Sequence, residues 1–105
     1  MKLQYKTALV TGAAVRIGRA LSETLAAAGY RMVIHYHRSE GQARALVASL
    51  QRRGAAAWMV GGDLTRAGAC ERVMERAWRL TGGVDILINN AAVFQAQPWA
   101  AVSDA

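Results

Sequence analysis

Short apolar segments alternate with longer segments of helical periodicity along this chain, and this alternation constrains its fold more than any other feature. The four apolar segments are Thr7–Val10, Met32–Tyr36, Ala57–Val60 and Val84–Ile88. Each is apolar nearly throughout, as in strands of a parallel sheet that is covered on both faces. Helical connections cross over in the right-handed sense, which gives the strand order 3-2-1-4. The sequence therefore predicts an α/β fold, the first half of a doubly wound parallel sheet, as a single unit over residues 1–105.

The three connecting segments carry apolar side chains at intervals of three and four residues, the spacing of one helix face. The residues expected on these faces are Ile17, Ala20, Leu21, Leu25 and Ala28 in the first helix, Ala43, Leu46, Val47 and Leu50 in the second, and Cys70, Val73, Met74 and Ala77 in the third. Gly29, Gly54 and Gly82 follow these segments, at positions where helices commonly end.

The charge balance is basic, with 13 Lys and Arg against 7 Asp and Glu and a formal net charge of +6. Such a balance suits anionic partners such as nucleotide phosphates, nucleic acids or acidic membranes. The basic residues are scattered, and Arg52-Arg53 is their one adjacent pair. No apolar run approaches the length of a membrane span. We therefore expect a small-molecule partner rather than nucleic acid or a membrane.

Cys70 is the single cysteine, so no internal disulfide can form. A chain without disulfides fits the reducing cytoplasm, where we expect this protein to reside. Cys70 is interpreted as a small apolar residue on a helix face. His35 lies inside the second strand, which favours a packed residue over a ligand or base, and no metal site is expected.

A glycine-rich segment, Thr11–Gly18, joins the first strand to the first helix. Gly12 allows a sharp turn after the strand, and Gly18 allows the helix to pack close to the sheet. The amide groups at the start of the helix, together with the helix dipole, favour a bound anion. Arg16 adds a positive charge at the same place, and Ile17 lies beside it. A turn that binds nothing remains the alternative on this segment alone.

The segment His37-Arg38-Ser39 follows the second strand, where a dinucleotide-binding fold meets the adenosine ribose. An acidic residue there would accept hydrogen bonds from the ribose hydroxyls and repel a 2′-phosphate. The first acid after the second strand is Glu40, and before it stands an arginine whose fork matches phosphate geometry. Within a dinucleotide fold, this segment favours NADP over NAD. The alternative is an ordinary polar loop.

Polar residues also follow the last two strands. Asp63, followed by Leu64, stands at the end of the third strand, where a carboxylate could contact an adenine edge or cap the next helix. Asn89-Asn90 and then Ala91 and Ala92 follow the fourth strand. Carboxamides can bind neighbouring backbone there, and small alanines let a ligand approach closely.

Taken together and in this order, the segments Thr11–Gly18, Asp63-Leu64 and Asn89-Asn90-Ala91 resemble the motifs of the short-chain dehydrogenases/reductases, from about Tyr5 to Pro98. The resemblance implies a Rossmann-type fold and an oxidoreductase that uses NADP(H). The residues that it implies around the cofactor are Gly12, Arg16, Ile17, Gly18, His37, Arg38, Ser39, Asp63, Leu64, Asn90, Ala91 and Ala92.

Two positions depart from the general family pattern, and one of them points to a narrower group within the family. Arg16 replaces the family's middle glycine, and Ala92 replaces the last glycine of its Asn-Asn-Ala-Gly motif. The pteridine reductases are similar to this chain in carrying a basic residue at position 16 and a closely matching segment at 35–39. That resemblance implies that Phe94 stacks on a pterin. Phe94 could also plug the core, and Val93 stands where those enzymes often have a small polar residue.

The family's catalytic Tyr and Lys, four residues apart, lie in the second half of its fold. The tyrosines of this chain are Tyr5, Tyr30 and Tyr36, and its lysines are Lys2 and Lys6. None has that spacing, so no catalytic residue is expected within the chain, and we expect the chain alone to be inactive. The resemblance further implies a homo-oligomer for the complete protein. A general carbonyl reductase and a non-catalytic dinucleotide-binding module remain alternatives.

Overall fold

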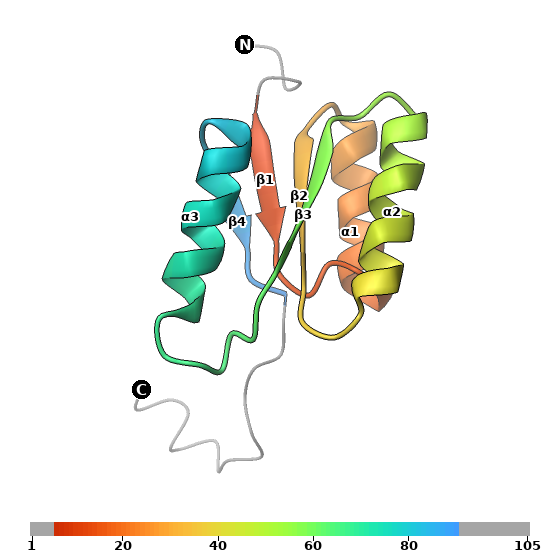
Figure 1. Ribbon diagram of the computed structural model, residues 1–105. Coiled ribbons are helices and arrows are strands. Elements are labelled where there is room, and N and C mark those ends of the chain that lie inside the picture. The colour runs from red at the N-terminus through yellow and green to blue at the C-terminus, as the bar shows by residue number, and fades with distance from the viewer. Residues whose placement is uncertain (1–5, 91–105) are drawn as a thin grey trace, which may run out of the picture.

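The computed structural model describes residues 6–90 (Figure 1). Its elements, in chain order, are β1 (Thr7–Val10), α1 (Arg16–Ala27), β2 (Arg31–Tyr36), α2 (Glu40–Arg52), β3 (Ala57–Gly61), α3 (Ala69–Thr81) and β4 (Ile86–Ile88). Strands and helices alternate as the sequence predicts. β4 begins two residues later than expected, because the main chain and carboxylate of Asp85 bond to Thr7 before the pairing starts.

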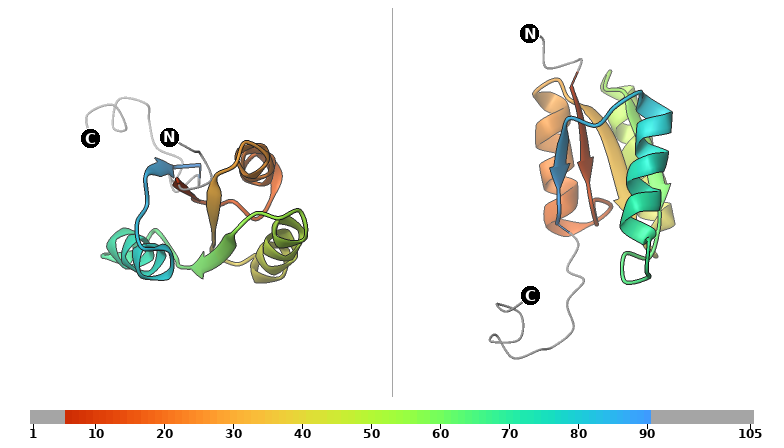
Figure 2. Two further views of the ribbon diagram at one scale, coloured as in Figure 1. Left: turned by 90° about the horizontal axis from the view of Figure 1, so that it is seen from above. Right: turned by 90° about the vertical axis from the view of Figure 1, so that its left-hand side faces the viewer.

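The strands form one parallel sheet in the order β3-β2-β1-β4, which confirms the predicted topology. Helices α1 and α2 cover one face of the sheet and α3 covers the other (Figure 2). All four residues of β1 and the four inner residues of β2 are buried. The two central strands are therefore covered on both faces, as their apolar runs predict.

Side chains alternate between two core clusters because successive residues of a strand point to opposite faces. On the side of α1 and α2, Val10 and Ile34 pack with Leu46 and Leu50. The smaller cluster under α3 consists of Leu9, Val33, Val60, Val73 and Ala77. The sheet therefore supplies a rigid platform whose strand ends carry the loops of interest.

The face that α1 buries differs from the predicted one. Ile17 is 69% exposed, and Ala20 and Ala28 are exposed as well. The buried residues of this helix are Gly18 and Ser22, whose hydroxyl donates to the Gly18 carbonyl oxygen at 2.8 Å. These small residues let the helix lie close to the sheet. Of the predicted face, Leu25 packs against the core and Leu21 is half-buried, so the prediction is correct only in part.

A similar correction applies to Cys70 in α3. The residues that α3 buries are Ala69, Val73, Ala77 and Thr81, which follow one another at intervals of four. Cys70 is exposed and is a free thiol. Its neighbour Ala69 occupies the inward position that the sequence assigned to Cys70. Among the three helices described, none is both long and apolar enough to cross a membrane.

An apolar surface remains uncovered beside β4. Leu87 on this strand and Trp78 near the end of α3 are each 52% exposed, and both line the same shallow hollow. Within residues 6–90, β4 is paired with β1 alone. An exposed strand edge flanked by large apolar side chains is a template for association with another chain.

We therefore expect the 105-residue chain to self-associate, and Leu87→Lys to shift it toward the monomer. The added ammonium must stay solvated, which opposes burial of the strand edge against a second copy. Sedimentation velocity over a range of concentrations measures the change. Ala20→Lys adds the same charge to an exposed position of α1 and should leave the association unchanged. A monodisperse monomer in the unsubstituted chain would contradict the expectation.

Candidate functional site

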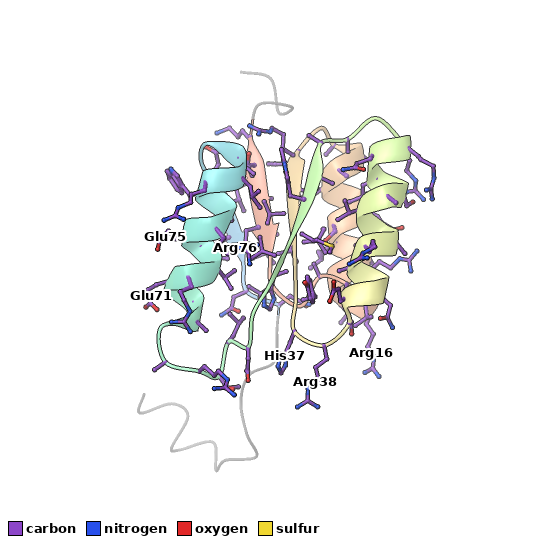
Figure 3. All side chains as sticks on the ribbon, viewed as in Figure 1. Arg16, His37, Arg38, Glu71, Glu75 and Arg76 are labelled. Carbon is purple, nitrogen blue, oxygen red and sulfur yellow. The ribbon has the colours of Figure 1, made fainter. Side chains whose placement is uncertain are left out.

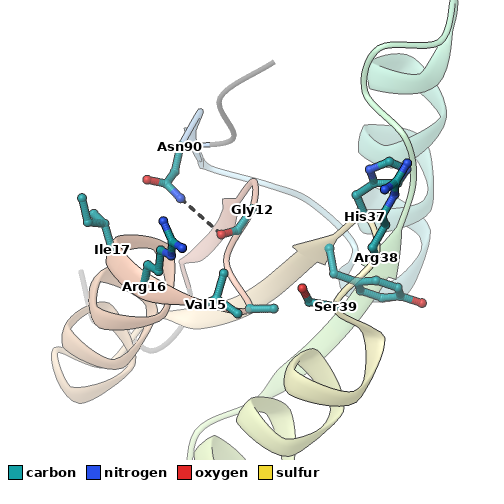
Figure 4. A pocket seen from close by; sticks show the side chains of 10 residues that line it. Gly12, Val15, Arg16, Ile17, His37, Arg38, Ser39 and Asn90 are labelled. Carbon is teal, nitrogen blue, oxygen red and sulfur yellow. Dashed lines mark hydrogen bonds between the residues drawn. The ribbon is translucent and has the colours of Figure 1, made fainter. Parts of the chain in front are cut away.

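The loops that follow β1, β2 and β4 meet at the carboxyl end of the sheet and form an open groove of about 470 Å³ (Figure 4). The groove is lined by Gly12, Ala14, Val15, Arg16, Ile17, Tyr36, His37, Arg38, Ser39 and Asn90. It therefore brings together predicted residues from three separate segments. Figure 4 shows Arg16 and Ile17 on one side of the groove and His37 and Arg38 on the other.

The glycine-rich turn is held in place by backbone and side-chain hydrogen bonds. Gly12 has a φ of 60°, in the left-handed region that glycine adopts without strain. Its amide donates to Nδ1 of His35 at 2.9 Å, and the amide of Ala13 donates to the carbonyl oxygen of His35, also at 2.9 Å. Nδ2 of Asn90 donates to the Gly12 carbonyl oxygen at 3.2 Å, as Figure 4 shows. His35 of β2 and Asn90 after β4 thus hold the peptide units on both sides of Gly12.

Gly18 is required by the close approach of helix and turn. A Cβ at this position would overlap the carbonyl oxygen of Gly12. It would also lie 2.6 Å from Nδ2 of Asn90 and 2.8 Å from Cα of Ala13. The side chain of Asn90 can therefore reach the turn only because residue 18 has none.

The start of α1 carries no negative charge. Val15 makes no side-chain capping bond there, and no acidic residue lies in the first turn. The orphan amides and the helix dipole therefore leave a positive end facing the groove. The guanidinium of Arg16 adds a positive charge. The backbone of Arg16 has a φ of 54°, a left-handed conformation that costs about 1–3 kcal/mol in a residue other than glycine.

Arg38 faces the same groove from the end of β2. Figure 3 shows Arg16, His37 and Arg38 at one end of the molecule, with the Arg38 side chain extending away from the sheet. Within residues 6–90, no carboxylate forms an ion pair with Arg16 or Arg38. Glu40, the first acid after β2, pairs instead with Arg44 at 2.6 Å. Both groove guanidiniums are therefore available to an anion.

Asp63 and Leu64 lie to the side of this groove and do not line it. Oδ1 of Asp63 accepts hydrogen bonds from the amide and hydroxyl of Thr65 at 3.0 and 2.6 Å, and these bonds lower the pKa of its carboxyl. Oδ2 lies 3.6 Å from Nε2 of His37. Asp63 does not cap α3, because that helix begins at Ala69. Leu64 packs against the cluster under α3. A contact of either residue with adenine stays a prediction.

His35 is a packed strand residue, as the sequence predicts, but sequence reasoning missed its hydrogen bonds to the glycine-rich turn and to Gly62. Its side chain is 1% exposed, and both ring nitrogens have partners. Nδ1 accepts from the Gly12 amide, and Nε2 lies 2.8 Å from the carbonyl oxygen of Gly62. Burial lowers the pKa of the imidazole, and a positive charge on His37 would lower it further. The sequence offered one indication of this role: His35 is a histidine inside a buried strand, two positions before the predicted binding segment.

Thr11 and Asn89 form a second connection that the sequence did not assign to the site. The Thr11 hydroxyl lies 3.0 Å from Oδ1 of Asn89, and the Thr11 amide donates to the carbonyl oxygen of Ile88 at 3.0 Å. Together with Asn90 they tie the end of β4 to the glycine-rich turn. The remaining predicted positions, Ala91, Ala92 and Phe94, lie outside the described residues.

The groove as described is suited to an elongated anion. It has a helix start without acidic residues at its base and one free guanidinium on each side. Across residues 6–90, no three His, Cys, Asp or Glu side chains come together in a group that could hold a metal ion. The arrangement offers binding groups for phosphates.

Comparison with known protein families gives a match over residues 6–105 to the model described as short chain dehydrogenase. Pteridine reductase 1 of Leishmania tarentolae is 35% identical, over 87% of this chain and 38% of its own length. The short-chain dehydrogenase/reductase homolog YusS of Bacillus subtilis is 33% identical, over 89% of this chain and 85% of its own length.

Among solved structures, FolM alternative dihydrofolate reductase 1 from Brucella canis, crystallised with NADP, superimposes with a TM-score of 0.84. It is 31% identical, and the match covers 96% of this chain and 43% of that protein. Other similar structures also contain NADP or NADPH. This chain thus spans about two fifths of the pteridine reductase and of the Brucella protein.

Proposed function

This chain belongs to the short chain dehydrogenase family, and from that premise we propose that it forms the NADP(H)-binding part of an oxidoreductase. The observation that carries the proposal is the pair of guanidiniums, Arg16 and Arg38, that face one groove without acidic partners. The solved relatives that hold NADP or NADPH support it. The bound nicotinamide would supply the hydride chemistry.

The residues of this chain would bind and orient the cofactor. The turn at Gly12 and the start of α1 would receive the pyrophosphate, whose charge the helix dipole and Arg16 would offset. Arg38 and the Ser39 hydroxyl would hold the 2′-phosphate of the adenosine ribose. Among the described residues that line the groove, none carries a carboxylate that could bind a free ribose diol, and Glu40 is paired with Arg44.

We expect the 105-residue chain to bind NADPH more tightly than NADH and to turn over neither. Binding follows from the groove, whereas turnover needs a proton donor within hydrogen-bond reach of the substrate. The Tyr and Lys four residues apart that the family uses for this step do not occur in residues 1–105. Titration calorimetry with both cofactors measures the preference. Absorbance of NADPH with dihydrobiopterin or a quinone measures turnover. Equal affinity for both cofactors would contradict the NADP assignment, and clear turnover would show that the catalytic groups have been misplaced.

For substrate, we propose a pterin or folate of the dihydro class. The support is the similarity of residues 35–39 to the pteridine reductases, together with the likeness to pteridine reductase 1 and to FolM. In this assignment Phe94 stacks on the pterin ring beside the nicotinamide. We further propose that the complete enzyme acts in the cytoplasm as a homo-oligomer, and the free thiol of Cys70 and the uncovered apolar surface beside β4 support this.

Phe94→Ala tests the substrate assignment in a protein that carries this chain together with the catalytic half of the family fold. Loss of stacking should raise the KM for dihydrobiopterin by about two- to tenfold, because aromatic pairs contribute about 0.5–1.5 kcal/mol beyond area burial. The affinity for NADPH should change much less, which makes cofactor binding the internal control. Unaltered pterin kinetics would favour a general carbonyl reductase.

A further inference from the structure

We propose that His35 is a positioning residue for the glycine-rich turn, and that cofactor binding is pH-sensitive because only the neutral ring can hold that turn. The inference deepens the proposed function and rests on it. His35 lies at the end of a buried strand, behind the groove rather than in it. It would therefore act on the cofactor through the turn and not by contact.

The geometry assigns one protonation state to the ring. The Gly12 amide is a donor, so Nδ1 must accept, and the Gly62 carbonyl oxygen is an acceptor, so Nε2 must carry the proton. A ring protonated on both nitrogens would place an N–H against the N–H of Gly12. With 1% of the side chain exposed, water cannot replace the lost bond.

Loss of that bond would be transmitted to the phosphate-binding surface. Residue 35 holds two successive amides of the turn, Gly12 through its side chain and Ala13 through its carbonyl oxygen. The Gly12 carbonyl, which shares a peptide unit with the Ala13 amide, accepts a hydrogen bond from Asn90 and lies against Gly18 near the start of the helix. Rotation of Gly12 would therefore disturb the helix start that is proposed to receive the pyrophosphate.

The charged groups around the ring favour this neutral state. His37, in the segment after β2, opposes a proton on His35. Asp63, the acid after β3, is engaged by Thr65 and lies beside His37 and Arg66, so it does not offset a charge on the buried ring. On the neighbouring elements, α3 presents Val73 and Ala77 to this layer of the core and β1 presents Leu9, all of them uncharged. Arg16 adds positive charge at the start of α1.

The sign of the pH effect follows from the lowered pKa of His35. The folded, turn-holding form prefers the neutral ring, so its advantage is complete above the ordinary histidine pKa of about 6.5 and is lost as the pH falls below it. The stability of the fold should therefore decline as the pH falls from about 6.5 toward the lowered pKa of the folded ring, and the affinity for the cofactor should decline once the pH reaches that lowered pKa.

The test compares the unsubstituted chain with His35→Asn and His35→Leu. Asparagine offers a carboxamide oxygen to the Gly12 amide and cannot take up a proton, whereas leucine offers no acceptor. Binding of NADP⁺ is measured by calorimetry between about pH 8 and about pH 5, at pH values where circular dichroism shows each variant to be folded. The 2′-phosphate titrates in the same range, but it does so equally for all three chains.

From about pH 8 to about pH 5, the affinity of each chain for NADP⁺ decreases by some factor. This factor should be about tenfold larger for the unsubstituted chain than for His35→Asn, as expected when one buried donor is left without a partner. His35→Leu should bind about tenfold more weakly than His35→Asn at every pH. Parallel pH profiles for the unsubstituted chain and His35→Asn would overturn the proposal for His35.

A second readout separates this proposal from the proposed function. Nitrogen NMR of the His35 ring identifies the protonated nitrogen without any ligand, and the Gly12 amide resonance should shift as the ring titrates. A proton on Nδ1 in the neutral ring, or a Gly12 amide that is insensitive to that titration, would overturn the positioning role. Absence of NADP⁺ binding at about pH 8, with the ring and the Gly12 amide behaving as expected, would count against the proposed function alone.

Discussion

Replacing Arg38 with Asp should reverse the cofactor preference from NADPH to NADH. The guanidinium has no acidic partner among residues 6–90, so the substitution breaks no internal ion pair. Each charge-assisted hydrogen bond to the 2′-phosphate contributes about 1.5–3 kcal/mol. Loss of one such bond lowers the affinity for NADPH by about 10- to 150-fold, and the new carboxylate repels the phosphate further. The same carboxylate can accept hydrogen bonds from the free ribose hydroxyls of NADH.

The measurement is the ratio of dissociation constants for NADPH and NADH in each variant. Arg76→Asp changes the net charge by the same amount on an exposed position of α3, and it should leave that ratio nearly unchanged. A ratio that responds equally to both substitutions would mean that general electrostatic attraction, and not the Arg38 fork, sets the preference.

Gly18→Ala should destabilise the fold and abolish cofactor binding together. The added methyl group would overlap the Gly12 carbonyl oxygen and crowd the Asn90 carboxamide and the Ala13 backbone. Two of these three neighbours are main chain, so the strain cannot be relieved by a change of rotamer. Overpacking of this kind costs about 1–3 kcal/mol. For a domain of this size, the midpoint of thermal unfolding should fall by about 4–8 °C for each kcal/mol.

Gly41→Ala supplies the matched control. A Cβ at residue 41 meets no atom within 4 Å, and the position lies within α2. The same addition of one methyl group should therefore stabilise the chain by about 0.5–1 kcal/mol through helix propensity, without an effect on NADPH affinity. Thermal melts of both variants with and without NADPH distinguish the two cases. A Gly18→Ala chain that melts and binds like the unsubstituted one would show that helix and turn are not in close contact.

The strands and their order could be predicted from the sequence because each strand is a short apolar run bounded by glycine or polar residues. Thr7–Val10 matches to the residue, and the parallel order follows from the helical connections. Apolar spacing predicted the buried face of α1 only in part: Leu25 packs against the core, whereas Ile17 and Ala20 are exposed. Close contact at Gly18 and Ser22 determines which side faces the sheet, and this outweighs the burial of Ile17.

The groove was predictable in part for a similar reason. The carboxyl ends of parallel strands lie at one edge, so Gly12, Arg38 and Asn90 were expected together, and the structure brings them together. Asp63 falls outside the groove lining because its carboxylate is bonded to the turn that follows it. The role of His35 depends on partners 23 and 27 residues away in the chain, which no local pattern reveals.

Because Arg16 has a left-handed backbone, a substitution that raises thermal stability at this position is expected to weaken ligand binding. Glycine would adopt a φ of 54° without strain, so a screen that selects for resistance to heat should enrich Arg16→Gly. Each such variant would lose a guanidinium from the wall of the groove. Directed evolution for thermal stability alone would therefore select proteins with a higher melting temperature and a lower affinity for phosphorylated ligands. Selection for binding in every round would prevent this loss.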